Sequence, residues 1–159
     1  NQKMCVPTPL HHVLGAGVGT TMMALHGQTA VFPSATILQV IAQEKCTAIC
    51  GTPTIYIDML RQLQKMPELD ISSLHKGFIA GAPCSSALVH RISTELNLPD
   101  LLMLYGATEM SIAVACSDLT EPRETRFSHV GHPLDHLELL LIDKKGNVVE
   151  RGVKGELLV

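Results

Sequence analysis

Short apolar runs alternate with helix-length segments along the first two thirds of the chain. The runs at 29–33, 47–51, 77–80 and 101–104 are predicted strands, because they are rich in apolar residues and bounded by glycine, proline or polar positions. The segments between them repeat apolar positions at helical spacing. This alternation predicts an α/β fold, a mostly parallel sheet flanked by helices.

Four helices are expected among these strands. Residues 13–26 are predicted to form a buried helix, and Ser34 is predicted to cap the next one. Pro53 stands where a third helix begins, and Ser85 or Ser86 caps a fourth in the segment SSALVHRISTEL. The apolar stripes of the second and third helices comprise Ile37, Leu38, Val40 and Ile41, and Ile57, Leu60 and Leu63.

The pattern changes after residue 111. The segments SIAVAC, HLELLLID and GELLV are typical of strands, and Gly146-Asn147 is typical of a hairpin turn. No helix of ordinary length is expected between them. We therefore expect an α/β subdomain over residues 1–111 and a β-rich segment over residues 112–159.

Composition excludes several classes of protein. With 159 residues, of which 46% are hydrophobic and 17% charged, the chain is expected to form one globular domain with a substantial core. A net charge of -3 and only two Tyr and three Phe, with no Trp, argue against nucleic acid as a partner. The apolar run at 13–25 is too short and too rich in glycine and threonine to span a membrane, so no transmembrane segment is expected.

The cysteines and the first residues indicate where the protein resides. The chain has five cysteines and no CxxC pair, which favours reduced thiols in an intracellular compartment. The opening NQKMCVPTPL lacks the features of a signal peptide and has no initiator methionine, so we expect an excised piece or a processed form.

Three polar loops follow three consecutive predicted strands. They are GTPT at 51–54, GAPCSS at 81–86 and YGATE at 105–109. Ligands of parallel α/β sheets collect outside the carboxyl ends of the strands, so these loops are expected to converge. GAPCSS offers small residues and backbone amides near a helix start, while YGATE offers an aromatic ring, a hydroxyl and a carboxylate. Together they suit a bound nucleotide with Mg²⁺.

Each loop also has a purely structural interpretation, and both interpretations remain open from the residues alone. Tyr105 fits an ordinary aromatic residue at a strand end, Thr108 a helix cap and Glu109 a first-turn carboxylate favoured by the helix dipole. Gly81-Ala82-Pro83 by itself is more often a plain turn.

Two other motifs are weaker. GAGVGT, residues 15–20, resembles a dinucleotide-binding loop, but Thr20 replaces the third glycine and no strand precedes it, so close helix packing through small residues is favoured. A Rossmann-type oxidoreductase built on this loop would bind NADH and lose it on Gly17→Asp. His11 and His12 lie in a loop with no other ligands at zinc spacing, which favours a structural or gating role over metal binding.

Six motifs in register carry a family resemblance over essentially the whole chain. PLHH (9–12), GTPT, GAPCSS, YGATE, VGHP (130–133) and GELLV (155–159) resemble the central part of the adenylate-forming superfamily. That superfamily includes acyl-CoA synthetases, firefly luciferase and the adenylation domains of non-ribosomal peptide synthetases. The chain is most similar to medium-chain acyl-CoA synthetases of the mitochondrial family-member-two type.

The resemblance implies roles for individual residues. Tyr105 matches the aromatic residue that stacks on adenine, Thr108 matches the hydroxyl that contacts the α-phosphate, and Glu109 matches the carboxylate that binds Mg²⁺. The ATP or AMP site would comprise Gly81, Ala82, Pro83, Tyr105, Gly106 and Thr108, with Thr108 and Glu109 as catalytic residues. The acyl pocket would comprise His12, Gly106 and Ala107, and His11 stands where the family usually has an aromatic residue.

The resemblance also implies an activity and its partners. Family members join a fatty acid to AMP from ATP, release pyrophosphate, and pass the acyl group to coenzyme A. The family's phosphate loop with its lysine, its ribose-binding aspartate and its catalytic lysine have no counterpart in the chain, so we expect the chain alone to be inactive. The alternative is a non-catalytic nucleotide-binding or interaction protein that retains part of the fold. The resemblance further implies an intracellular, mitochondrial matrix location.

Overall fold

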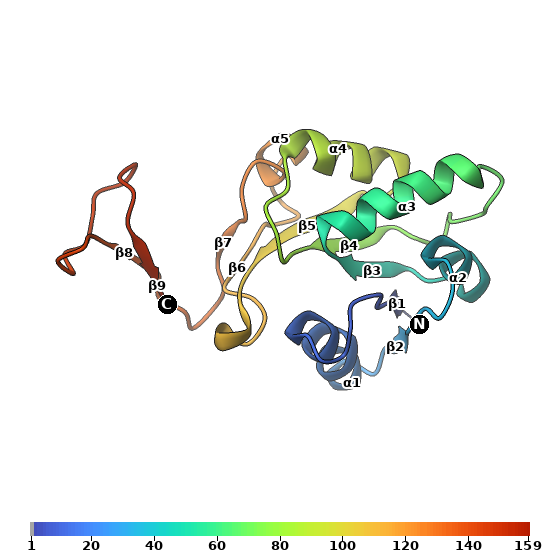
Figure 1. Cartoon of the computed structure of the whole chain (residues 1–159), viewed down its shortest axis with the longest axis horizontal. Helices are drawn as coiled ribbons and strands as arrows, with labels where there is room; N and C mark the ends of the chain where they lie inside the picture. The colour runs from blue at the N-terminus through green and yellow to red at the C-terminus, as the bar shows by residue number, and fades with distance from the viewer. Residues whose placement is uncertain (1) are drawn as a thin grey trace.

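A seven-stranded sheet forms the centre of the molecule, with strand order β2-β1-β3-β4-β5-β6-β7 (Figure 1). The structure is a computed structural model that describes residues 2–159. Strands β1 to β5 run parallel, and β6 and β7 continue the sheet antiparallel. The strands are β1 (Lys3–Cys5), β2 (Thr29–Val31), β3 (Ala48–Gly51), β4 (Lys76–Ile79), β5 (Asp100–Tyr105), β6 (Ala115–Cys116) and β7 (His132–Pro133).

Helices cover the two faces of the sheet unequally. Helices α2 (Ile37–Glu44), α3 (Pro53–Lys65) and α4 (Ser86–Glu95) pack on one face, with α3 and α4 above the sheet in Figure 1. The π-helix η1 (Leu14–Met22) and the short α1 (Met23–Leu25) lie on the other face. The α/β fold with a mostly parallel sheet is therefore confirmed.

Alternation along the strands explains the two layers of core. In β3, Ile49 belongs to the larger hydrophobic cluster, while Ala48 and Cys50 belong to the smaller one against η1. In β1, Cys5 belongs to the larger cluster and Met4 to the smaller. Successive side chains of a strand point to opposite faces, so a strand covered on both faces is apolar at every position, as β3 is.

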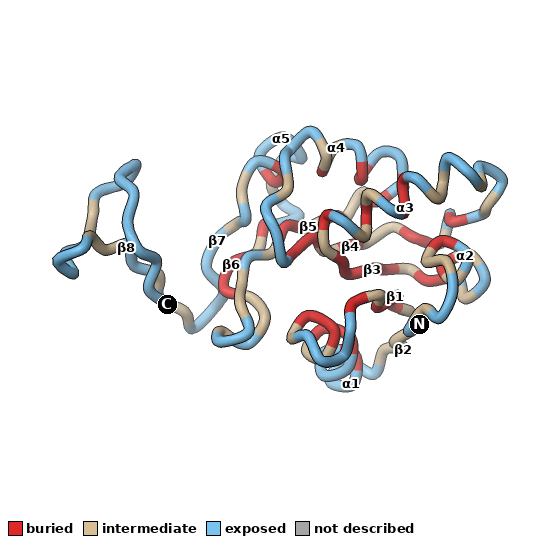
Figure 2. The backbone as a smooth tube through the Cα atoms, viewed as in Figure 1, coloured by how far each residue is buried: buried red, intermediate tan, exposed pale blue. Residues whose placement is uncertain are grey.

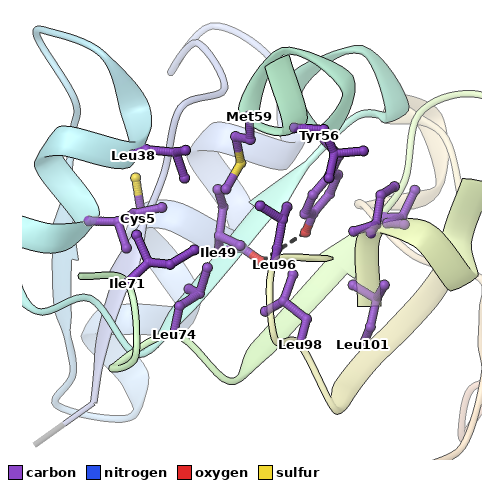
Figure 3. Packing of buried hydrophobic residues seen from close by; sticks show 14 of the residues in the cluster. Cys5, Leu38, Ile49, Tyr56, Met59, Ile71, Leu74, Leu96, Leu98 and Leu101 are labelled. Carbon is purple, nitrogen blue, oxygen red and sulfur yellow. Dashed lines mark hydrogen bonds between the residues drawn. The ribbon is translucent and has the colours of Figure 1, made fainter. Parts of the chain in front are cut away.

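The larger cluster fills the space under α2, α3 and α4 (Figure 3). Tyr56 is fully buried there, and its hydroxyl lies 2.9 Å from the carbonyl oxygen of Phe78 and 3.4 Å from that of Ile49. Burial raises the pKa of Tyr56 well above its ordinary value. The hydroxyl is thus held neutral and hydrogen-bonded to the sheet.

Most predicted helices are present, with local corrections. The helix predicted at 13–26 is mainly the π-helix η1, and the predicted cap Ser34 is wrong, since Thr36 precedes α2 and no side chain caps it. Pro53 begins α3 as predicted, and Ser85 caps α4 by accepting a hydrogen bond from the Leu88 amide at 3.3 Å.

The predicted face of α3 is only partly correct. Its buried residues include Tyr56, Met59 and Leu60, and Leu63 packs at the edge of the cluster, but Ile57 does not belong to the cluster. The helix buries a face rotated from the predicted stripe toward Tyr56 and Met59. The reason is that a fully buried tyrosine with a hydrogen-bonded hydroxyl replaces the expected aliphatic residue.

The C-terminal residues form a separate hairpin. Strands β8 (Leu140–Ile142) and β9 (Glu156–Leu158) make a two-stranded antiparallel sheet that stands apart from the main sheet in Figure 1. The predicted turn at Gly146 is present, with the Asp143 carboxylate accepting hydrogen bonds from the backbone amides of Lys145 and Asn147 at 2.7 and 2.9 Å. Of the predicted strand at 111–116, only Ala115–Cys116 pairs.

Two short helices complete the secondary structure, η2 (Thr108–Met110) and α5 (Arg123–Arg126). Within residues 2–159, no helix has the length and apolarity needed to cross a membrane.

Candidate active site

A cavity of about 400 Å³ opens at the carboxyl ends of β4 and β5. Three segments form it: the loop between β4 and α4, the end of β5, and the segment between α5 and β7. Its lining residues are Gly81, Ala82, Pro83, Cys84, Met103, Leu104, Tyr105, Phe127, Ser128, His129 and Val130. The first two segments are GAPCSS and the start of YGATE, so the structure brings these two loops together at one edge of the sheet.

The GAPCSS loop turns sharply where β4 ends. Gly81 has φ +85, a left-handed conformation that glycine adopts without strain. A Cβ built on Gly81 would lie 3.3 Å from Cγ2 of Thr52, a residue of the GTPT loop after β3. GTPT therefore contacts the back of this turn, although it is not part of the cavity lining. Partial burial raises the pKa of the Cys84 thiol, which keeps it neutral beside the cavity.

Tyr105 lies at the end of β5, where hydrogen bonds to the following segment hold its backbone. The Tyr105 carbonyl accepts a hydrogen bond from the Val114 amide at 2.7 Å, and Ser117 exchanges two bonds with Met103, at 2.8 and 3.0 Å. The Tyr105 side chain is 39% exposed. The backbone of Tyr105 is thus held by the neighbouring strand, while the residue remains partly exposed and lines the cavity.

The third wall, Phe127 to Val130, was not predicted as part of a site. Phe127 is 2% exposed and packs edge-to-face on His90 of α4, with ring centroids 5.0 Å apart. The neighbouring Arg126 is buried, and its guanidinium donates to the carbonyl oxygens of Pro99 and Leu119 at 2.9 and 3.2 Å. These contacts fix the segment against β5 and α4. VGHP, which begins at Val130, was the only sequence signal near it.

Glu121 lies beside His129 of this wall and beside His132 of β7. One carboxylate oxygen lies 3.3 Å from Nε2 of His129 and 3.1 Å from Nε2 of His132. The Gly131 amide donates to Nδ1 of His129 at 2.8 Å, so a neutral His129 carries its proton on Nε2 and donates it to Glu121. The pKa of Glu121 lies below its ordinary value, because the Asp118 amide donates to the carboxylate and both imidazoles lie beside it.

The rest of YGATE leaves the cavity along η2. Gly106 and Ala107 are half-buried, while Thr108 and Glu109 are exposed. None of these four lines the cavity. Within residues 2–159, the Glu109 carboxylate has no hydrogen bond or ion pair of its own.

The predicted residues before η1 lie in an exposed loop. His11 and His12 are both exposed, and Nδ1 of His12 accepts a hydrogen bond from the Leu14 amide at 3.1 Å. That bond makes His12 part of the turn that leads into η1. Neither histidine joins a group of three potential metal ligands among the described residues.

The glycines of GAGVGT serve packing, as predicted. A Cβ on Gly15 would overlap the carbonyl oxygen of Pro9, and one on Gly19 would overlap the side chain of Val6. A Cβ on Gly17 would overlap the side chain of Ile112. The three glycines therefore let η1 approach the sheet, its own preceding loop and the loop after YGATE.

Glu109 and Thr108 fit a magnesium ion that takes most of its ligands from a bound phosphate. Proteins usually bind such an ion through one or two carboxylates, with phosphates and water completing the coordination. Glu109 is exposed and its carboxylate is unpaired within the described residues, and Thr108 directly precedes it on the same short helix. The donor set suits a nucleotide-bound ion better than a structural site.

The whole chain is similar to known enzymes. Residues 1–159 match the family model described as AMP-binding enzyme. The chain is 36% identical to the mitochondrial medium-chain acyl-CoA ligase ACSF2 of Danio rerio, covering 100% of this chain and 27% of the relative. It is 37% identical to the acyl-CoA ligase sidI of Aspergillus fumigatus, covering 98% of this chain and 27% of that protein. The chain thus spans about a quarter of the length of these relatives.

Solved structures share the fold. The anthranilate CoA ligase AuaEII in complex with anthranoyl-AMP superposes with a TM-score of 0.86 at 24% identity, covering 99% of this chain and 31% of that one. The amide bond synthetase McbA from Marinactinospora thermotolerans gives 0.80 at 26% identity, covering 98% and 32%. The fold, the match over all 159 residues and the identity to acyl-CoA ligases agree, and the chain belongs to the AMP-binding enzyme family.

Proposed function

We propose that the protein is an acyl-CoA ligase that activates a fatty acid with ATP and transfers it to coenzyme A. The observation that carries this proposal is the shared cavity of the GAPCSS loop and Tyr105 at the carboxyl ends of β4 and β5. The mitochondrial and fungal relatives are named acyl-CoA ligases, and one structural neighbour was solved in complex with anthranoyl-AMP, an acyl-adenylate.

The cavity suits the adenine of a nucleotide. Its lining includes the apolar residues Met103, Leu104 and Phe127 together with the small residues of the GAPCSS loop. A flat base can stack on the accessible ring of Tyr105 while backbone groups at Gly81 and Ala82 meet its polar edge. Pro83 and Gly106 complete the proposed ATP or AMP site.

The phosphates would lie toward η2. In this proposal the Thr108 hydroxyl donates to an oxygen of the α-phosphate, and Glu109 holds Mg²⁺. The ion would neutralise charge on the phosphates when bound. The substrate carboxylate attacks the α-phosphorus, the bond to pyrophosphate breaks, and an acyl-adenylate forms. The thiolate of coenzyme A then attacks the acyl carbon and AMP leaves. The residues of this chain contribute by holding the reacting groups in line.

The acyl group would lie on the η1 side of YGATE. His12 from the loop before η1, and Gly106 and Ala107 from the backbone after Tyr105, are proposed to border it. Both Gly106 and Ala107 are half-buried, and the backbone of Ile112 packs against them.

We further propose that these 159 residues do not complete the reaction without additional groups. The chain spans about a quarter of the length of the acyl-CoA ligases that it resembles, which supports this proposal. Transfer of an adenylyl group ordinarily requires cationic groups near the reacting phosphate. A location in the mitochondrial matrix is part of the proposal, and the animal relatives are named as mitochondrial proteins.

The proposal is tested by ATP–pyrophosphate exchange with Glu109→Gln in the protein as its gene encodes it. We expect exchange to fall about 100-fold or more, because a metal ligand is lost from the reacting phosphate. Circular dichroism should remain unchanged, since Glu109 is exposed and contributes no core volume. Glu68→Gln is the matched control, an exposed glutamate after α3. Exchange by Glu109→Gln at the level of Glu68→Gln would refute the assigned role.

A further inference from the structure

Ile112 occupies an unusual position just after YGATE. Its φ is +93, and the preceding Ser111 has φ +54. A β-branched residue rarely adopts a positive φ, because its Cβ substituents crowd the backbone. Such strain persists only where surrounding contacts hold it, and it is concentrated at ligand sites.

Two glycines make room for Ile112. Gly17 of η1 leaves space for its side chain, since a Cβ on Gly17 would overlap Cδ1 of Ile112. Gly106 leaves space for its main chain, since a Cβ there would overlap the Ile112 carbonyl oxygen. The Ile112 amide also donates to the Ala107 carbonyl at 3.4 Å. Ile112 therefore joins η1 to the backbone that follows Tyr105.

A second, apolar cavity of about 280 Å³ lies beside Ile112 on the η1 face of the sheet. Val18 and Met22 of η1, Phe78 of β4 and Leu104 of β5 form much of its wall. Leu104 also lines the larger cavity that carries Tyr105, so one residue near the end of β5 borders both cavities. A volume of this size lies at the small end of ligand sites and suits a hydrocarbon chain rather than a second nucleotide.

We propose that Ile112, whose side chain packs against Gly17, limits the length of the hydrocarbon chain that the acid substrate can place in this apolar cavity. The inference rests on the proposed function, because it requires an acid whose carboxylate is near Gly106. Removing Cδ1 of Ile112 extends the cavity into the space above Gly17. Adding a Cβ at Gly17 forces Ile112 away from η1 and into the cavity. The two changes thus act in opposite directions on the same space.

The test measures kcat/KM for pyrophosphate exchange with butanoate, octanoate and dodecanoate, in the protein as its gene encodes it. Ile112→Ala should raise the ratio for dodecanoate over butanoate by about tenfold or more, since each methylene in an apolar pocket changes discrimination by roughly that factor. Ile112→Val, which removes Cδ1 and keeps the β-branch, should shift the ratio in the same direction by less. Gly17→Ala should lower it.

The double variant Gly17→Ala, Ile112→Ala tests whether the two positions act on the same space. The new Cβ at Gly17 fills the space that Ile112 vacates, so the ratio should return toward that of the parent, which is a coupling that independent sites would not give. Ile57→Ala, a half-buried isoleucine on the outer face of α3, should leave the ratio unchanged. An unchanged ratio in both Ile112 variants, with exchange intact, overturns the inference and leaves the proposed function standing.

A binding measurement distinguishes a failure of this inference from a failure of the proposed ligase reaction. The isoleucine δ-methyl signals of the protein are followed by NMR during titration with octanoate. The Ile112 signal should shift and the Ile57 signal should not. If the Ile112 signal shifts but no acid supports exchange, the proposed reaction is wrong and the apolar site stands. If octanoate leaves the Ile112 signal in place, the inference is wrong, whatever the exchange assay gives.

Discussion

The main sheet and the C-terminal hairpin use similar apolar residues with opposite results. In the main sheet Leu101 of β5 is completely buried, while Leu157 of β9 is 36% exposed. Figure 2 shows the difference, with buried residues concentrated in β3, β4 and β5 and exposed residues along the hairpin. The two regions differ in what covers them, since α2, α3 and α4 lie over the sheet and the structure packs no second layer on β8 and β9 within the described residues.

The difference teaches that an apolar pattern specifies a strand but not its burial. Alternation and β-branched residues favour pairing, whereas burial needs a second layer at the right distance. Stability in this chain should therefore come from the layered region of β1 to β5, and changes in the hairpin should have little effect on it.

The largest expected difference is between two matched leucines. Leu101→Ala removes a fully buried side chain of the larger cluster and should lower the free energy of unfolding by about 2–5 kcal/mol. Leu157→Ala should change it by no more than about 0.5 kcal/mol. Urea unfolding followed by circular dichroism measures both. Equal losses in the two variants would show that the hairpin belongs to the same cooperative core.

Alkaline pH should weaken the layered region. Burial is the main cause that raises the pKa of the Cys50 thiol from 9.0 to about 11. A raised pKa contributes stability that is fully present below pH 9 and is lost as pH rises toward 11, up to about 3 kcal/mol. Unfolding free energies measured across this range should fall less steeply in Cys50→Ala than in the parent. Parallel curves would contradict the assignment.

In the hairpin, the contribution of Asp143 to stability depends on pH in the opposite direction to that of Cys50. The pKa of Asp143 is lowered, chiefly because the Asn147 amide donates to its carboxylate. Its contribution is present at neutral and alkaline pH and is lost only in acid. Asp143→Asn is therefore the control for the alkaline experiment, and its curve above pH 9 should run parallel to that of the parent.

Two glycines with similar backbone conformations should respond differently to alanine. Gly131 has φ +90 and Gly146 has φ +84, so both substitutions carry the strain of a left-handed conformation. A Cβ on Gly131 would also overlap the backbone of Cys116, whereas nothing lies within 4 Å of one on Gly146. Gly131→Ala should be less stable than Gly146→Ala by about 1–3 kcal/mol in thermal or urea unfolding. A smaller loss for Gly131→Ala would mean that β6 and β7 are not closely paired.

The smallest expected effect is at the start of α4. Ser85→Ala removes the hydroxyl that accepts from the Leu88 amide and should destabilise the chain by about 1 kcal/mol. Ser85→Asp should retain the stability, because a carboxylate accepts the same bond. If Ser85→Ala and Ser85→Asp unfold at the same urea concentration, the cap contributes nothing measurable.

Most of the main sheet could be predicted from the sequence. The strands at Thr29, Ala48, Lys76 and Asp100 follow from short apolar runs, and Pro53 and Ser85 identify two helix starts through local chemistry. The packing role of the glycines in η1 was predicted, but its π-helical winding was not, because apolar periodicity alone does not separate a π-helix from an α-helix. The face of α3 depends likewise on where the Tyr56 hydroxyl finds its acceptor.

Part of the candidate site was also predictable. Adjacent parallel strands bring the loops after β4 and β5 to one edge, so Gly81 and Tyr105 meet as the topology requires. The wall from Phe127 to Val130 arrives through antiparallel pairing of β6 with β7, which no local pattern indicated. The strained Ile112 could not be foreseen either, since its conformation depends on contacts with Gly17 and Gly106.

The most direct test of the account is whether AMP binds in the cavity beside Tyr105. Backbone amide signals are followed by NMR during titration with AMP, in the parent, in Tyr105→Ala and in the control Tyr56→Phe, which keeps the buried ring. We predict that the signals of Gly81, Ala82 and Tyr105 shift in the parent, that Tyr105→Ala weakens binding by about 1–3 kcal/mol through lost stacking, and that Tyr56→Phe binds as the parent does. Shifts confined to other parts of the chain, or equal affinity in the parent and Tyr105→Ala, would contradict the account.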